Sequence, residues 1–137
     1  MNREQEIAFI QSFVRREARD RTQFELLSKK KRGRFLSKLC HDYDSVLDTR
    51  YLKQITQPNS DFETILELLE QEGASDTCYA ISANDEIDGE TLQLSDALEK
   101  AVGFGLPTIL ICIPGKLAYF EAEQMAGPPP RYLLKKH

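Results

Sequence analysis

Residues 106–123, LPTILICIPGKLAYFEAE, constrain the fold more than any other stretch of this chain. The run TILICI at 108–113 is apolar and rich in β-branched residues, and it is far too short to cross a membrane. Such a run is typical of a central strand that is buried on both faces. Pro114 and Gly115 then favour a tight turn, because Pro presets φ and Gly accepts a positive φ. Residues 117–121 resume as a second strand, so the stretch predicts a β-hairpin in the core.

Two segments near the N-terminus have helical patterns. Apolar side chains recur every three to four positions across residues 3–27, which predicts one long amphipathic helix. A second pattern of this kind spans residues 30–48. Gly33 lies early in that segment and disfavours a helix interior, so the helix begins either before it or just after it. We expect the two helices to pair as a helical hairpin whose basic sides face outward.

The chain then changes from helix to strand signals. Ser60 and Glu63 match a capping box, in which the hydroxyl accepts from a free amide and the carboxylate reaches back. This predicts a third helix that begins at the box and ends at Gly73. The sequence TCYAIS at 77–82 is apolar almost throughout and predicts the first strand of a sheet.

The remaining signals complete a small sheet. Ser95 favours a cap for a fourth helix over residues 96–102, and residues 132–134 predict a last short strand at an edge. With the hairpin, this gives about four strands in the order β-α-β-β-β. The pattern predicts a single α+β domain, in which a helical half (1–73) packs on a sheet-containing half (74–137).

Charge is divided unequally between the two halves of the chain. The whole chain carries a net charge of −4. Residues 1–60 contain 13 Lys and Arg against 8 Asp and Glu, whereas residues 61–137 contain 5 against 14. Such a division indicates either a half that binds a polyanion or two halves that attract each other, within one chain or between the copies of a homodimer.

The composition predicts a cytoplasmic protein with no membrane segment. No stretch approaches the length of a transmembrane helix, and the N-terminus lacks the apolar run of a signal peptide. The three cysteines are Cys40, Cys78 and Cys112. An odd number, with two of them in expected strands, favours reduced thiols packed as small hydrophobic side chains.

The sequence Cys40-His41-Asp42 resembles a nucleophile, a base and an orienting carboxylate. Adjacent residues of a helix point about 100° apart, so we expect the thiol and the imidazole to lie on different sides. An enzyme that uses Cys40 or Cys112 therefore remains a third hypothesis behind two binding functions. We expect no catalytic residue and no cofactor.

Two further patterns are incomplete. Residues 84–95 align with a calcium-binding loop, but Ser95 stands where the bidentate Glu belongs. Gly103 and Gly105 invite a dinucleotide interpretation, yet a helix precedes them and a strand follows, which is the reverse of the required order. With one internal His and no CxxC motif, we expect no metal site.

Two functions remain as hypotheses. The first is a non-enzymatic protein-interaction or regulatory module, such as an antitoxin or immunity protein, that engages a basic protein through an acidic surface. That surface comprises Asp85, Glu86, Asp88 and Glu90. The alternative is a nucleic-acid-binding protein that contacts phosphates through its N-terminal helices. The residues for this alternative are Arg15, Arg16, Arg19, Lys30, Lys31, Arg34 and Lys38.

Overall fold

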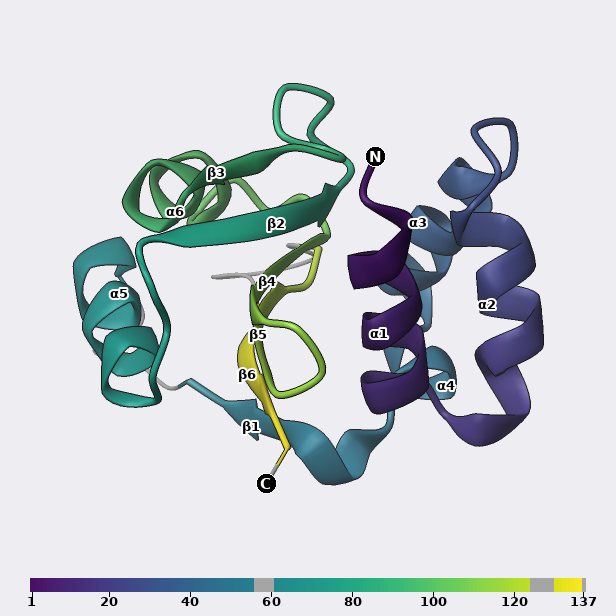
Figure 1. Ribbon diagram of the computed structural model, residues 1–137, viewed down its shortest axis with the longest axis horizontal. Helices are drawn as coiled ribbons and strands as arrows, with labels where there is room; N and C mark the ends of the chain where they lie inside the picture. The colour runs from purple at the N-terminus through teal and green to yellow at the C-terminus, as the bar shows by residue number, and fades with distance from the viewer. Residues whose placement is uncertain (56–60, 124–129, 137) are drawn as a thin grey trace.

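A six-stranded antiparallel sheet forms the middle layer of the molecule, and helices cover both of its faces (Figure 1). The computed structural model describes residues 1–55, 61–123 and 130–136. The strands are β1 (Leu52–Gln54), β2 (Thr77–Ser82), β3 (Thr91–Gln93), β4 (Thr108–Ile113), β5 (Leu117–Glu121) and β6 (Arg131–Lys135). Their order across the sheet is β1-β6-β5-β4-β2-β3, and the α+β prediction is confirmed.

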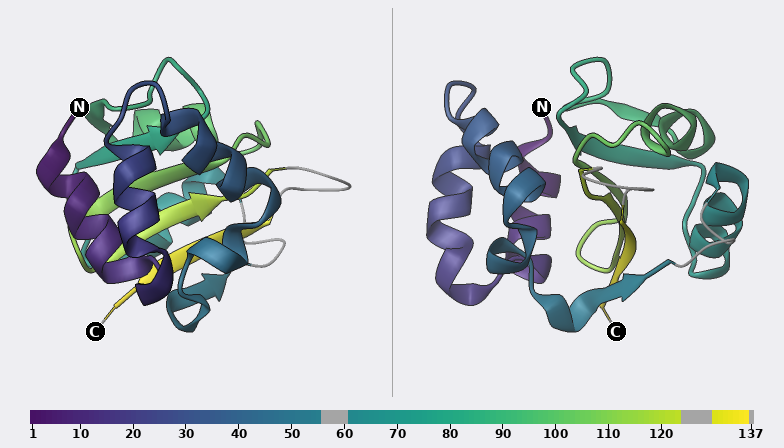
Figure 2. Two further views of the ribbon diagram at one scale, coloured as in Figure 1. Left: turned by 90° about the vertical axis from the view of Figure 1, so that its right-hand side faces the viewer. Right: turned by 180° about the vertical axis from the view of Figure 1, so that it is seen from behind.

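The helices divide between the two faces of the sheet (Figure 2). The first face carries α1 (Arg3–Phe13), α2 (Arg19–Leu26), α3 (Arg32–His41) and α4 (Tyr43–Val46), with the short 3₁₀ turns η1 (Arg16–Ala18) and η2 (Thr49–Tyr51). The opposite face carries α5 (Phe62–Gln71) and α6 (Leu94–Ala101). No helix among the described residues is both long and apolar enough to span a bilayer.

The predicted hairpin is confirmed at the bounds that the sequence indicated. Gly115 has a φ of +77° in the turn between β4 and β5, as the Pro-Gly pair predicts. Alternate side chains of β4 enter two separate cores, because successive residues of a strand point to opposite faces. Ile109 and Ile111 pack with the α1–α4 layer, whereas Leu110 and Cys112 pack with the α5–α6 layer.

The prediction of one continuous helix over residues 3–27 is wrong. Val14 is extended, with φ −90° and ψ 140°, and it forms an isolated antiparallel bridge with Leu47. The Asp48 amide donates to the Phe13 carbonyl, and the Arg15 amide donates to the Val46 carbonyl, both at 2.8 Å. This backbone pairing between distant segments replaces helical hydrogen bonds and ends α1.

The second predicted helix is also shorter than expected. It begins at Arg32, keeps Gly33 within its first turn, and ends at His41. Asp42, with φ −155° and ψ 45°, separates it from the single turn of α4. The expected pairing of two N-terminal helices is found between α2 and α3.

The caps of the later helices differ from those expected. Asp61 caps α5 by accepting from the Thr64 amide at 2.7 Å, whereas the proposed capping residue Ser60 lies outside the described residues. Gly73 ends α5 with a φ of +103°, as predicted. The prediction that Ser95 caps α6 is wrong, because this helix already begins at Leu94 and has no side-chain cap.

The sheet is wider than the predicted four strands. β1 and β3 are three-residue strands that close its two edges, and β1 comes from the half of the chain that was expected to be helical. The last strand predicted at residues 132–134 is confirmed as β6, but its expected position at an edge is wrong, because β6 pairs with β5 on one side and with β1 on the other.

Candidate protein-interaction surface

Two loops lie side by side beyond the paired ends of β2 and β4. Ser82 at the end of β2 pairs with Thr108 at the start of β4, because these strands are antiparallel. The loop of residues 83–90 follows β2, and the loop of residues 102–107 precedes β4. The Ala83 amide donates to the Pro107 carbonyl at 3.0 Å and joins the two loops directly. The first loop extends beyond the sheet edge in Figure 1. We call the two loops together the loop pair.

The acidic loop of the pair is held in place by one of its own carboxylates. Asp88 accepts from Nε and Nη2 of Arg32, at 2.8 and 2.9 Å, and from the Ser82 amide at 2.9 Å. Gly89 follows with a φ of +76°, which turns the chain back into β3. Asp88 therefore points inward, in contrast to the exposed position that the sequence suggested.

Three of the four predicted acidic side chains stay at the surface. Asp85, Glu86 and Glu90 are exposed, and the Glu86 amide donates to the Asn84 side chain at 3.0 Å. This local hydrogen bond closes a compact turn at the tip of the loop. The exposed acidic group is thus smaller than predicted, but its backbone is well anchored.

The anchor of Asp88 extends into a buried network. Arg32 also donates to Glu6 at 3.0 Å, and Tyr79 donates its hydroxyl proton to Glu6 at 2.6 Å. Burial alone would lower the pKa of the Arg32 guanidinium, but its hydrogen bonds to Asp88 and Glu6 outweigh burial and raise it. Burial, followed by the hydrogen bond to Glu6, raises the pKa of Tyr79 to about 12. The network keeps Arg32 charged and connects α1, α3, β2 and the acidic loop.

A second buried carboxylate holds the other loop. Glu121 is fully buried and accepts from the backbone amides of Gly103 and Gly105, both at 3.2 Å. It also accepts from the Tyr119 hydroxyl at 2.9 Å and from Arg131 at 3.1 Å. Burial, together with the charge of Glu121, raises the pKa of Tyr119. With so many donors around one carboxylate, this loop has a fixed shape.

The fixed loop presents apolar side chains to solvent. Phe104 is 63% exposed and Leu106 is 41% exposed, although both are large hydrophobic residues. The Leu106 carbonyl accepts from the Thr108 hydroxyl at 3.2 Å, and this hydroxyl is hydrogen-bonded to Ser82 at 2.7 Å. The loop pair therefore carries two exposed apolar side chains on one loop and an exposed acidic turn on the other. Sequence reasoning considered Gly103 and Gly105 for a dinucleotide motif and missed this exposure.

The loop pair continues into an acidic helical layer. Within residues 61–107, all of which the structure describes, ten carboxylates are exposed against a single exposed lysine, Lys100. The carboxylates belong to Asp61, Glu63, Glu67, Glu70, Asp76, Asp85, Glu86, Glu90, Asp96 and Glu99. The unequal charge of the two sequence halves thus becomes a difference between the two faces of the sheet.

The predicted basic residues form two groups rather than one surface. Arg15, Arg16 and Arg19 lie around η1, at one end of α2, whereas Lys30, Lys31, Arg34 and Lys38 lie on the α2–α3 turn and on α3. The eight residues of α2, about 12 Å in length, separate the group at η1 from the α2–α3 turn that carries Lys30 and Lys31.

Several of these basic side chains are engaged within the protein. Arg15 donates to the Asp44 carbonyl at 2.7 Å, and Lys38 donates to the buried Glu25 at 2.9 Å. Around the α2–α3 turn, Phe24 is 47% exposed and its ring lies 3.8 Å from the Lys31 ammonium. Phe24 falls within the amphipathic helix predicted over residues 3–27, whose apolar side was expected to face the core, so this exposed aromatic side chain was missed.

The calcium-loop alignment does not assemble a cation site. Asp88, which would be a ligand, is bound to Arg32, and Asn84 accepts from the Glu86 amide. The thiols of β2 and β4 are equally unsuited to surface chemistry, because burial raises the pKa of Cys78 to about 12 and also raises that of Cys112.

Cys40 and His41 lie closer together than expected. At the C-terminal end of α3, the Cys40 thiol, an imidazole nitrogen of His41 and a carboxylate oxygen of Glu123 all lie within 4.8 Å of one another. Burial, and to a lesser extent the charge of Glu123, raises the pKa of Cys40. A raised pKa keeps the sulfur protonated, which is the opposite of what activates a cysteine nucleophile.

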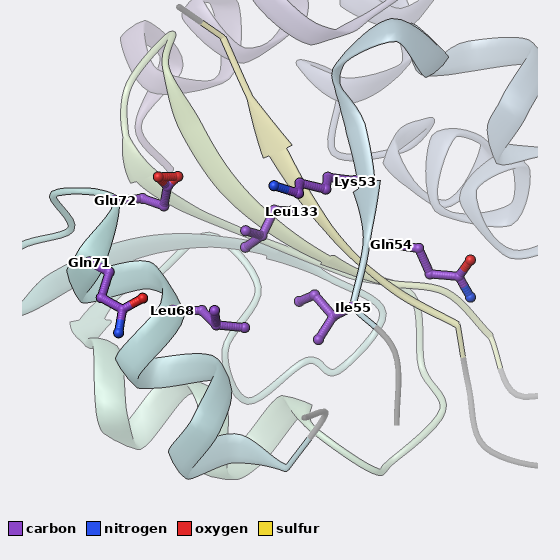
Figure 3. A pocket seen from close by; sticks show the side chains of 7 residues that line it. All are labelled: Lys53, Gln54, Ile55, Leu68, Gln71, Glu72 and Leu133. Carbon is purple, nitrogen blue, oxygen red and sulfur yellow. The ribbon is translucent and has the colours of Figure 1, made fainter. Parts of the chain in front are cut away.

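A groove of about 300 Å³ lies between β1 and α5, on the face of the sheet that α5 and α6 cover (Figure 3). Leu133, Ile55 and Leu68 form its apolar part, and Lys53 and Glu72 lie at its rim. Glu72 is paired with Lys135 at 2.6 Å. The groove offers no converging set of reactive side chains among the described residues.

Comparison of the chain with protein-family models, curated proteins and solved structures found no match, so its function is argued from its own geometry.

Proposed function

We propose that the chain is a non-enzymatic protein-interaction or regulatory module that binds a basic protein through the loop pair. The observation that carries this proposal is the exposure of Phe104 and Leu106 on a loop that is hydrogen-bonded to the loop of Asp85 and Glu86. An inhibitory role of the antitoxin or immunity type is one form that such binding takes. The free thiols at Cys40, Cys78 and Cys112 suit a reducing compartment such as the cytoplasm.

The physical case rests on two properties of the loop pair. Exposed aromatic side chains provide much of the affinity in protein interfaces when they enter a pocket on the partner. Asp88 and Glu121 fix both loops before binding, so little conformational entropy is lost when the complex forms. The carboxylates of the acidic layer would attract a basic partner and accelerate its association.

The test is a charge reversal on the acidic loop with a matched control. The variant Asp85→Lys, Glu86→Lys, Glu90→Lys should lose a protein captured by the native chain from a cell lysate. The control Glu63→Lys, Glu67→Lys, Glu70→Lys makes the same change in net charge on α5. We expect the control to retain the partner with slower association, because charges outside the contact act mainly on the association rate.

A second variant tests the apolar part of the same surface. Phe104→Ala should weaken binding of the identified and purified partner at least about tenfold, which corresponds to about 1.4 kcal/mol. Glu121 keeps the loop backbone in place in this variant, so its folding should be unchanged. Equal effects of the loop and α5 reversals, or full affinity in Phe104→Ala, would contradict the proposal.

Nucleic-acid binding is a second candidate, and one observation favours it. The exposed ring of Phe24 lies 3.8 Å from the Lys31 ammonium and 6.0 Å from the Arg21 guanidinium, a combination that suits base stacking beside phosphate contacts. This candidate predicts a nucleic-acid absorbance that accompanies the purified chain at low salt and is removed at high salt. It also predicts loss of that absorbance in Lys30→Glu, Arg34→Glu, whereas the loop-pair proposal predicts no effect of this change on the protein partner.

A further inference from the structure

Three side chains with different metal-binding chemistry converge where α3 ends. Cys40 and His41 are the last two residues of this helix, and Glu123 lies two residues beyond the end of β5. Their ligand atoms all lie within 4.8 Å of one another, and the His41 Nδ1 is 3.6 Å from a Glu123 carboxylate oxygen. Chain segments separated by some 80 positions in the sequence thus contribute to one cluster.

We propose that Cys40, His41 and Glu123 bind a single zinc ion or a chemically similar divalent transition metal. A thiolate, an imidazole and a carboxylate are the three side-chain ligands that zinc takes in proteins. The thiolate and the carboxylate together balance the two positive charges of the ion, and the imidazole remains neutral. Water completes a tetrahedral site as the fourth ligand.

The observed geometry is close to what the ion requires. Zinc–ligand distances of about 2.0–2.3 Å at tetrahedral angles separate the ligand atoms by about 3.3–3.6 Å. The pair formed by His41 and Glu123 already has this spacing. The remaining contraction is about 1 Å, which rotation of the exposed His41 side chain and the partly exposed Cys40 side chain provides.

Binding at this cluster needs no other reactant. A metal–sulfur bond replaces the S–H bond of Cys40, the proton passes to solvent, and no oxidation state changes. Because the ligands lie on α3 and next to β5, the ion would cross-link the N-terminal helical layer to the sheet. The cluster uses none of the residues of the loop pair, so this inference is independent of the proposed function.

The experiment is a metal titration of the reduced, tag-free chain. Cobalt(II) serves as the spectroscopic probe, because cobalt–thiolate ligation produces a charge-transfer absorption in the near ultraviolet. We expect one cobalt ion per chain, with this absorption present in the native chain and absent in Cys40→Ser. Cys78→Ala is the matched thiol control and should keep the absorption, because Cys78 lies in β2, outside the cluster.

Competition with zinc then measures the contribution of the other two ligands. His41→Ala and Glu123→Gln should each lower zinc affinity by more than about 100-fold, since loss of outer partners alone costs about 10- to 100-fold. Glu86→Gln is the carboxylate control and should leave the affinity unchanged. His41 is exposed, so circular dichroism should show that its variant folds normally. The absence of a cobalt–thiolate absorption in the native chain, its persistence in Cys40→Ser, or unchanged zinc affinity in His41→Ala would overturn the proposal.

Discussion

Arg32 on α3 links α1 to the acidic loop through two ion pairs. Its side chain is 5% exposed and pairs with Glu6 and Asp88. Replacing Arg32 with Ala leaves two carboxylates without their cation, one of them fully buried, and such changes cost about 3–5 kcal/mol. We expect Arg32→Ala to lower the free energy of unfolding by this amount, measured by urea denaturation at neutral pH.

Arg34 provides a control on the same helix. It lies two residues further along α3 and is exposed, so Arg34→Ala should change the free energy of unfolding by no more than about 0.5 kcal/mol. Arg32→Lys should fall between the two variants, because one ammonium group cannot reproduce the planar fork that faces both Glu6 and Asp88. Similar, small effects of both alanine variants would show that the buried network does not stabilise the fold.

The sequence shows which residues are charged, but it does not show which of them form buried ion pairs. Asp88 was grouped with its acidic neighbours because nothing local distinguishes a carboxylate that turns inward from one that faces solvent. Its partner Arg32 lies 56 positions away, so only the tertiary fold reveals the pair. The same applies to Glu121, which binds amides of a loop 16 to 18 positions earlier, and to Glu123, which joins Cys40. Long-range polar pairing has no periodicity that a sequence displays.

The edge strand β1 was not predicted from the sequence, and its pairing with β6 can be tested directly. The Ile55 amide donates to the Arg131 carbonyl, and hydrogen-bonded pairs alternate along an antiparallel ladder. The Lys53 amide therefore also faces β6, whereas the Gln54 amide faces solvent. Lys53→Pro should lower the free energy of unfolding by about 1–3 kcal/mol, because it leaves a carbonyl of β6 unpaired.

Gln54→Pro is the matched control, since both side chains are exposed and adjacent in the strand. A proline whose missing amide would have faced solvent is tolerated at a sheet edge, so we expect a change of about 0.5 kcal/mol or less. Urea denaturation of the two variants measures both changes in the free energy of unfolding. A larger loss for Gln54→Pro than for Lys53→Pro would mean that the pairing between β1 and β6 is in a different register.

Local patterns predicted elements well only where one element carried its own signals. The β4–β5 hairpin contains two apolar strands and a Pro-Gly turn, and its predicted bounds are confirmed. β1 and β3 have three residues each, which is too short for an alternating pattern to stand out. α1 was extended too far because its periodicity continues past Val14, and the bridge from Val14 to Leu47 depends on a segment 33 positions away.

For the molecule as a whole, the sheet separates two hydrophobic cores as well as two charged layers. One core lies beneath α1–α4 and the other beneath α5 and α6. Each of β2, β4, β5 and β6 contributes side chains to both cores, because successive residues alternate between the faces. Loss of either core would destabilise strands that also form part of the other core. The halves of the sequence should therefore unfold together, as the prediction of a single domain requires.

Leu39 and Leu69 allow this cooperativity to be measured. Both are fully buried, Leu39 on α3 and Leu69 on α5, so each faces a different core. Leu39→Ala and Leu69→Ala should each lower the free energy of unfolding by about 2–5 kcal/mol, with a single transition and an unchanged denaturant dependence. Urea denaturation followed by far-ultraviolet circular dichroism and by tyrosine fluorescence should give coincident curves for both variants. If Leu69→Ala instead produced an early, separate transition, the α5–α6 layer would be an independently unfolding unit, and its acidic surface could change without affecting the basic layer.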